Sequence, residues 1–383
     1  MNNINRFFQK LVLFIGVLVF SQSCLNFEKK GSLNTCNIIS NLYKLKKINS
    51  TINFGLDSVS SASIDYLKLK KINDTLFFTF LNTYNNTIYC YDYDTKKLKK
   101  LIPLSSNKKI KAYEIIAWDS IISYQYWDQK ITLQNESGKI LKEMIIPIEN
   151  NKSGYCAQPS TISPIICRKD KFYLAGGIGT SEKANKLSHS VAQIDISFKK
   201  YNYKLNFPKI YSDYFFGGKH YNLNISYTYN DKDNIFVFSF PASHSLISTK
   251  DFITFKEHCA GSKHIQNIPE YSYIGEDKTY DYCTENGFYY SVLYDKYNNL
   301  YYRVCLLPSD VVLGYKSKRD LSIIILDSKF KIVGEQLLKN VKDFSIETIS
   351  SVCVTPDGLL FQKENNITND NLISFINYKI VKI

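Results

Sequence analysis

The chain has 383 residues and a formal net charge of +13, and it contains 30 tyrosines and 24 phenylalanines. A chain of this length can form one large β domain or two ordinary domains, and its aromatic content favours strands. The basic residues are almost all lysines scattered in short runs. This pattern indicates a solvated surface and argues against a nucleic-acid partner.

The first thirty residues have the layout of a secretory signal. A polar head with Arg6 and Lys10 precedes an apolar run at residues 11–20, and Ser23-Cys24 follows closely. The run is too short for a membrane span, which needs about 20 residues. A cysteine directly after a small residue resembles a bacterial lipobox. We therefore expect a signal peptide at 1–23, a lipidated N-terminus and tether at 24–50, and anchoring to outer-membrane lipid through Cys24. The alternative is an ordinary signal peptide with an incidental cysteine.

A turn followed by a strand-like run recurs six times, as NDTLFFTF, WDSIISYQY, KDKFYLAG, KDNIFVFSF, YNNLYYRVCLL and PDGLLFQK. Each phrase sets an Asp or Asn before a large apolar residue, and such side chains stabilise tight turns by bonding to the local backbone. A second apolar run follows each phrase, so each unit predicts three or four short antiparallel strands. The turn residues are Asp74, Asp119, Asp170, Asp233, Asn298 and Asp357.

These repeats predict an all-β domain over residues 51–383, a β-propeller of about six blades. Four-stranded units of this size pack face to face around an axis, and the ring must close to bury every blade face. Thr51 to Ser58 alternates in polarity ahead of the first unit, so we expect it to complete the last sheet as an N-terminal closing strand. The alternatives are a seventh blade within 201–232 or 252–293, and a pair of β-sandwiches.

Eight cysteines follow Cys24, and export would permit them to form disulfides. Several of them, including Cys90, Cys305 and Cys353, lie in apolar runs. A free cysteine in such a run behaves as a small hydrophobic residue. We therefore expect mostly buried free thiols, and if a disulfide forms we expect it between Cys156 and Cys167 across a proline-containing loop.

Several phrases from residue 166 onward resemble the family catalogued as domain of unknown function 4221. They are ICRKDKFYL (166–174), AGSK (260–263), SVLYDKYNNLYYRVCLLP (291–308), LSIIILDSKFKIVGEQLL (321–338) and LISFINYKI near the end. The resemblance covers most of the chain after about residue 70. It implies a propeller-like lipoprotein of a Gram-negative bacterium. Because the family has no assigned activity, the resemblance implies no mechanism.

Arginine is rare in this lysine-rich chain, yet Arg168 and Arg303 both lie in phrases shared with that family. A planar guanidinium forms paired hydrogen bonds that an ammonium cannot copy. We expect each guanidinium either to bridge neighbouring blades through such paired hydrogen bonds or to bind a ligand in the central funnel. Asp295, from the same phrase as Arg303, is a further candidate for either role.

Two side-chain clusters outside the repeats are candidate sites. Tyrosines gather in the least repeat-like segment and mark a candidate functional loop; they include Tyr271, Tyr273, Tyr280 and Tyr282. Glu257, His258 and His264 have the short spacing of metal ligands. Strand geometry would separate these three side chains, so we expect no metal, and nothing in the sequence indicates a cofactor.

Two classes of function remain. No G-x-S-x-G, H-E-x-x-H or P-loop motif occurs, so the first class is a non-catalytic binding or scaffold protein whose ligand is a protein, peptide or glycan. The second class is a propeller hydrolase or lyase acting on glycans or lactones. Its funnel groups would come from Asp295, Glu285, His258 and His264, and three or more of these meeting in space would favour the enzyme.

Overall fold

The computed structural model describes residues 31–36, 40–60, 64, 66–146, 155–178, 188–217, 225–272, 278–309, 319–339, 349–364 and 371–383. The expected signal peptide, Cys24 and Tyr273 therefore lie outside the described residues. In the described ranges, no helix has the length and apolar character needed to cross a membrane.

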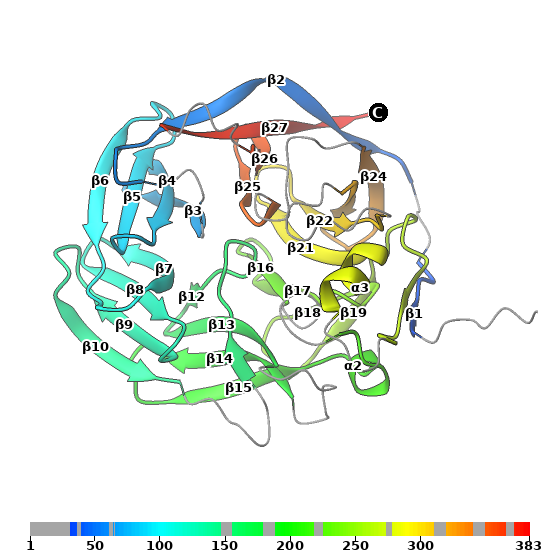
Figure 1. The fold of residues 1–383 in the computed structure, drawn as a ribbon, viewed down its shortest axis with the longest axis horizontal. Coiled ribbons are helices and arrows are strands. Elements are labelled where there is room, and N and C mark those ends of the chain that lie inside the picture. The colour runs from blue at the N-terminus through cyan, green and yellow to red at the C-terminus, as the bar shows by residue number, and fades with distance from the viewer. Residues whose placement is uncertain are drawn as a thin grey trace, which may run out of the picture. The chain divides into compact units, whose positions relative to one another are not determined.

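Four-stranded sheets follow one another around a common axis, and each sheet is one blade (Figure 1). Blade 1 contains β3 (Leu67–Ile72), β4 (Thr75–Asn82), β5 (Thr87–Asp92) and β6 (Leu98–Pro103). Blade 2 contains β7 (Ile110–Ala117), β8 (Ser120–Gln125), β9 (Lys130–Gln134) and β10 (Ile140–Ile145). Blade 3 contains β12 (Ile166–Arg168), β13 (Lys171–Ile178), β14 (His189–Asp195) and β15 (Tyr201–Asn206), and β11 (Tyr155–Ala157) also pairs with β13.

The second half of the ring has the same plan. Blade 4 contains β16 (Ser226–Asn230), β17 (Ile235–Ser239), β18 (Ser245–Thr249) and β19 (Lys256–Cys259). Blade 5 contains β21 (Phe288–Asp295), β22 (Leu300–Leu306), β23 (Leu321–Asp327) and β24 (Ile332–Leu338). Blade 6 contains β25 (Val352–Thr355), β26 (Gly358–Gln362), β27 (Leu372–Lys382) and β2 (Tyr43–Gly55). The fold is thus a six-bladed β-propeller.

The predicted Asx turns connect the first and second strands of the blades. In blade 1 the turn residues Asn73 and Asp74 have φ angles of 46° and 64°, and Asn234 and Asn299 take φ angles of 58° and 55° in blades 4 and 5. Asp and Asn tolerate this left-handed region better than other side chains do. The segments considered for a seventh blade instead contain short elements, among them the helices α2 (Ile210–Asp213) and α3 (Thr279–Glu285).

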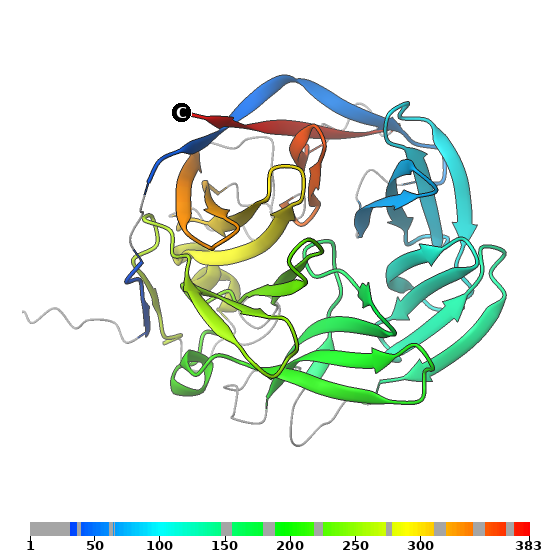
Figure 2. The same cartoon turned by 180° about the vertical axis from the view of Figure 1, so that it is seen from behind.

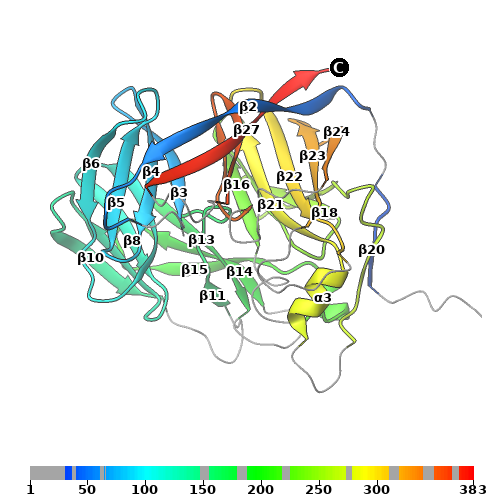
Figure 3. The same cartoon turned by 45° about the horizontal axis from the view of Figure 1, so that its top comes forward.

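The ring closes through the N-terminal strand, as the sequence predicts. β2 pairs antiparallel with β27 from Tyr43 opposite Lys382 to Gly55 opposite Leu372. Figure 3 shows the two strands side by side across the top of the ring. Residues 43–50, which we expected in the tether, belong to this strand. Because most side chains of this segment are exposed, its hydropathy pattern does not indicate a strand.

The core lies in the layers between neighbouring blades, where apolar side chains of facing sheets meet. Phe54 of β2 stacks on Phe78 of β4 with ring centroids 4.1 Å apart, and so packs the closing strand against blade 1. Another layer joins blades 5 and 6 through residues such as Val304, Ile323 and Leu359. The view from behind shows the same ring of sheets (Figure 2). Burial against both neighbours explains why single blades are not stable units.

Candidate functional site

Arg303 lies on β22 at the junction of blades 4 and 5 and is completely buried, with 0% of its surface exposed. Its guanidinium carbon lies 3.6 Å from the ring centroid of Tyr289. Each of the three guanidinium nitrogens donates a hydrogen bond to blade 4 or to the loop that follows it. The closest acceptors are Ser239 Oγ (3.0 Å), His244 O (3.1 Å), Ala260 O (2.9 Å) and Ser243 O (2.7 Å).

His244 and Tyr289 continue this network as a buried chain of hydrogen bonds. The Tyr289 hydroxyl accepts from the Ser262 N–H at 3.1 Å and donates to His244 Nδ1 at 2.5 Å. His244 Nε2 lies 2.8 Å from Ser32 O, so it carries the imidazole proton and donates it to this carbonyl. Burial, assisted by the charge of Arg303, lowers the pKa of His244 to about 4. The imidazole is therefore neutral near pH 7.

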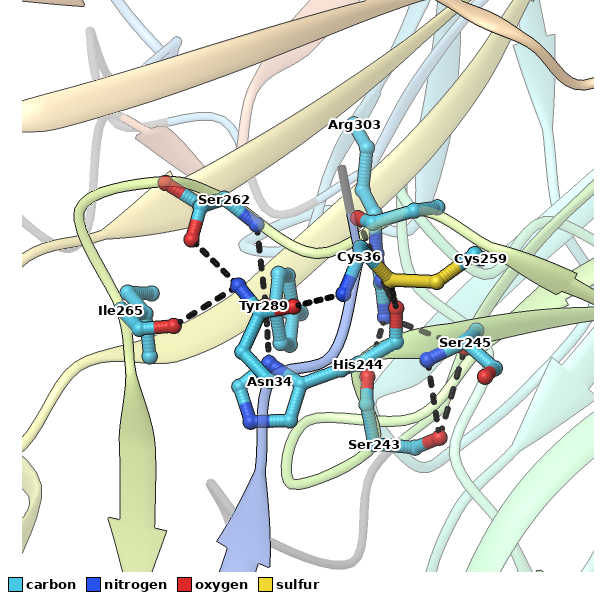
Figure 4. The surroundings of a disulfide bond; sticks show 11 residues. Asn34, Cys36, Ser243, His244, Ser245, Cys259, Ser262, Ile265, Tyr289 and Arg303 are labelled. Carbon is cyan, nitrogen blue, oxygen red and sulfur yellow. Dashed lines mark hydrogen bonds between the residues drawn. A yellow bond between two sulfur atoms is a disulfide. The ribbon is translucent and has the colours of Figure 1, made fainter. Parts of the chain in front are cut away.

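The network binds an N-terminal arm that precedes the closing strand (Figure 4). β1 (Gly31–Leu33) pairs with β20 (Asn267–Pro269), and a disulfide joins Cys36 to Cys259 at the end of β19. Asn34 Nδ2 donates to Ser262 O at 2.7 Å. A Cβ atom at Gly261 would lie 2.1 Å from Asn34 Oδ1. Only glycine therefore lets the arm pack this closely.

The disulfide corrects our expectation for Cys156 and Cys167, which are both free. These two cysteines pair with β13 opposite Gly177 and Phe172 respectively. Five positions along a strand separate them by roughly 16 Å. A disulfide needs Cα atoms closer than about 7 Å, so the pair cannot form. The expected free thiols Cys90, Cys305 and Cys353 are buried and free.

The AGSK phrase at 260–263 contributes contacts that the sequence analysis missed. Besides the Ala260 carbonyl and the Gly261 packing, Ser262 Oγ donates to Glu335 Oε1 of β24 at 2.5 Å. The family resemblance of the AGSK phrase is the sequence signal that could have indicated the junction of blades 4 and 5.

Arg319 is a second buried guanidinium, and it is 3% exposed. It donates to Leu307 O at 2.7 Å and to Asn286 O at 2.9 Å.

Arg168 and Asp295 occupy different surroundings from Arg303. Arg168 Nη2 donates to Asn234 Oδ1 of blade 4 at 2.7 Å, and its guanidinium carbon lies 5.2 Å from the Tyr229 ring centroid. Asp295 is 1% exposed and accepts from the Tyr302 hydroxyl at 2.8 Å and from the Asn298 N–H at 3.0 Å. Arg168 thus spans blades 3 and 4, whereas Asp295 stabilises its own turn in blade 5.

The tyrosines of the candidate loop pack inward where the structure describes them. The Tyr271 ring meets the Tyr282 ring edge-on at 5.3 Å, and the Tyr282 hydroxyl donates to Pro269 O at 2.5 Å. Tyr282 is only 3% exposed. Tyr280 lies on α3, but its side chain falls outside the described part, as does the whole of Tyr273. These contacts tie α3 to β20 on the flank of the ring.

A short segment before β12, Ser160–Ile165, crosses the propeller axis. At blade 1, Thr161 Oγ1 accepts from Leu67 N at 3.1 Å. At blade 4, Ile162 O accepts from Ser226 Oγ at 2.6 Å and from Tyr227 N at 3.2 Å. Blades 1 and 4 face each other across a six-bladed ring, so the chain itself occupies this part of the axis.

A charged cluster lies beside this crossing, on the innermost strands of blades 1 and 2. Glu114 of β7 is 4% exposed; it pairs with Lys68 and, at 2.7 Å, with Lys70 of β3. Burial alone would raise the pKa of Glu114, but the two lysines hold it below its usual value. Lys68 also donates to Ile165 O at 2.9 Å. The cluster therefore fastens the crossing segment.

The groups considered for metal binding or for catalysis are dispersed. His258 Nε2 lies 2.7 Å from Ser248 Oγ, and its ring stacks on Phe330 with centroids 4.0 Å apart. Glu285 ends α3 before β21, whereas Asp295 ends β21. The length of that strand separates them by roughly 25 Å. Across the described ranges, no three His, Cys, Asp or Glu side chains gather as a metal site requires.

A cavity of about 560 Å³ lies between blades 3 and 4. Lys204 of β15 and Glu257 of β19 line it, together with Phe252 and Phe255 of the loop between β18 and β19. Its volume falls within the range of roughly 300–1,000 Å³ that is usual for ligand sites. We call this cavity the blade 3–4 groove. The sequence pattern indicates Glu257 only as a candidate metal ligand, because no local motif marks the two walls of the groove.

The propeller resembles solved structures from Bacteroides. A protein of the DUF4221 family from Bacteroides vulgatus superposes with a TM-score of 0.74 at 19% identity, covering 90% of this chain and 100% of the other. A Bacteroides fragilis protein that carries the description of an exported protein superposes with a TM-score of 0.53 at 10% identity, covering 91% and 99%.

No curated protein matches the chain in sequence at a significant level. The sequence model of a family described as Domain of unknown function (DUF4221) matches residues 43–337. This range runs from the first residue of the closing strand into the last strand of blade 5. The chain belongs to the DUF4221 family.

Proposed function

We propose that the protein is exported and held in the outer membrane by a lipid on Cys24, with the propeller facing the periplasm or the cell surface. The basic head, the apolar run and the cysteine after Ser23 support this address. The description of the B. fragilis protein as exported agrees with it. The Cys36–Cys259 disulfide also supports export, because disulfides persist in oxidising compartments.

We further propose that the propeller acts as a non-catalytic binding module for a protein, peptide or glycan. The observation that carries this proposal is the crossing of the axis by Ser160–Ile165. The crossing occupies part of the axis, the region where a propeller enzyme would gather its reacting groups. Meanwhile Arg303, Glu114 and Asp295 bond to the propeller itself. The blade 3–4 groove offers a concave, charged surface for a ligand instead.

Metabolic labelling with a clickable palmitate analogue tests the proposed address. The wild-type protein should take up the label and sediment with outer membranes. Cys24→Ala should remain unlabelled, because the acceptor thiol is missing. Cys167→Ala is the matched control, since it removes a free cysteine inside the propeller, and it should label as the wild type does. Equal labelling of Cys24→Ala and wild type would disprove lipidation.

A further inference from the structure

The blade 3–4 groove contains a strained residue in one of its walls. Leu205 has a φ angle of +54°, in a region that bulky side chains rarely adopt. Every other described non-glycine residue with positive φ lies in a connection between strands, whereas Leu205 lies inside β15. The fully buried Ser190 donates from Oγ to Leu205 O at 2.8 Å and stabilises this conformation. Strained backbone of this kind concentrates at binding sites.

One wall of the groove is a strand edge, and the other is the face of a blade. β15 is the outermost strand of blade 3 and pairs with β14. Ile247 of β18 and Glu257 of β19 lie opposite each other in the sheet and project from the same face of blade 4 into the groove. The six residues of β15 present an edge roughly 20 Å long. A row of main-chain donors and acceptors is matched best by another extended chain, which can add to the sheet as a further strand. This feature favours a peptide over a glycan.

The side chains of the groove add both charge and apolar surface. Lys204 stands on the β15 wall and Glu257 on the β19 wall, so the two walls carry opposite charges. Phe255 is 40% exposed, and the neighbouring Ile253 is 82% exposed. Asp251 Oδ1 accepts from the N–H groups of Ile253 at 2.8 Å and Thr254 at 2.9 Å. The apolar loop is therefore fixed in place before a ligand arrives, which lowers the entropy lost on binding.

We propose that the blade 3–4 groove binds an extended peptide segment that pairs with the edge of β15. An acidic side chain of the peptide meets Lys204, a basic one meets Glu257, and an apolar one packs on Phe255. The proposal rests on the binding function proposed above and names its ligand class. The partner is thus an unfolded or loop segment of another protein that carries charges of both signs.

A phage library of random dodecapeptides tests this proposal. The phage are selected for binding to the purified full-length protein in detergent. The enriched peptides are then synthesised and their affinities measured by fluorescence anisotropy. Glu257→Lys should weaken binding about ten-fold or more, and replacing the basic residue of the peptide by an acidic one should restore it. Methylation of the peptide backbone at every second nitrogen should abolish binding, because alternate N–H groups face the strand edge.

Trp127→Ala is the matched control, since this tryptophan is 75% exposed on the turn between β8 and β9 of blade 2. It should bind the peptides as the wild type does. Peptides that lose affinity with Trp127→Ala but not with Glu257→Lys would overturn the groove while leaving the binding function intact. Enrichment of ligands from a glycan array, with no peptide enriched, would overturn the ligand class. Binding of neither library would contradict both proposals.

Discussion

Two regions hold this ring together in different ways. At blade 6, the 13-residue strand β2 and the 11-residue strand β27 form a long main-chain ladder. At the junction of blades 4 and 5, side chains dominate: one buried guanidinium bonds to several carbonyls, and a disulfide fastens the N-terminal arm. The same N-terminal segment serves both regions, through residues 31–36 and then 43–55.

The difference predicts how each region responds to mutation. A ladder distributes its stabilisation over many similar hydrogen bonds. The closure at blade 6 therefore depends on the whole strand β2 and on the buried ring of Phe54. The junction concentrates its stabilisation in Arg303, whose charge is costly to bury unless every donor finds a partner. A single conservative substitution should therefore matter at the junction more than on the exposed face of the ladder.

Loss of the closing strand should have the largest effect. Deletion of residues 51–58 should abolish cooperative unfolding and cause aggregation, because β27 would expose an unpaired edge. Phe54→Ala is a milder version and should lower the free energy of unfolding by about 3–5 kcal/mol. Urea denaturation measures both variants. The control Val59→Ala changes a side chain that is 58% exposed and should be nearly neutral. Unchanged unfolding of the deletion variant would contradict closure through β2.

Arg303→Lys should have the next largest effect. An ammonium cannot reach the separate acceptors that the guanidinium serves, so we expect a loss of about 1–3 kcal/mol in the free energy of unfolding. Arg168→Lys is the matched control and should cost less than about 1 kcal/mol, because the Arg168 bond to Asn234 is exposed. If Arg303→Lys unfolds like the wild type but loses ligand binding, Arg303 belongs to a binding site and the structural role fails.

The junction should also make stability depend on pH. The pKa of His244 falls from 6.5 to about 4 on folding, so the fold favours the neutral imidazole. This stabilisation is complete above pH 6.5 and is lost as the pH falls toward 4. The loss should reach about 2 kcal/mol at pH 5. His244→Gln should remove most of this slope in denaturation series, whereas His258→Gln, the control, should remove a smaller part, because burial also lowers the pKa of His258. An unaltered slope in His244→Gln would exclude His244 as the cause.

Local patterns in the sequence account for the repeating part of the fold. The Asx turns, such as Asp74 and Asp233, and the alternation at Thr51–Ser58 depend on neighbours only a few residues away. They therefore predict the blades and the closing strand correctly. The same logic explains the buried free thiols, because an apolar run of strand residues places Cys90 and Cys305 in the core.

Tertiary structure decided which distant residues meet. Cys36 and Cys259 are 223 residues apart, and Ser160–Ile165 crosses the axis because of where two opposite blades stand. The groove depends on the spacing between the edge of β15 in blade 3 and the facing side of blade 4, and no local property of β15 or β19 encodes that spacing. Turn preference and strand alternation act over a few residues. Disulfide partners, axial contacts and ligand sites require the whole ring to be assembled.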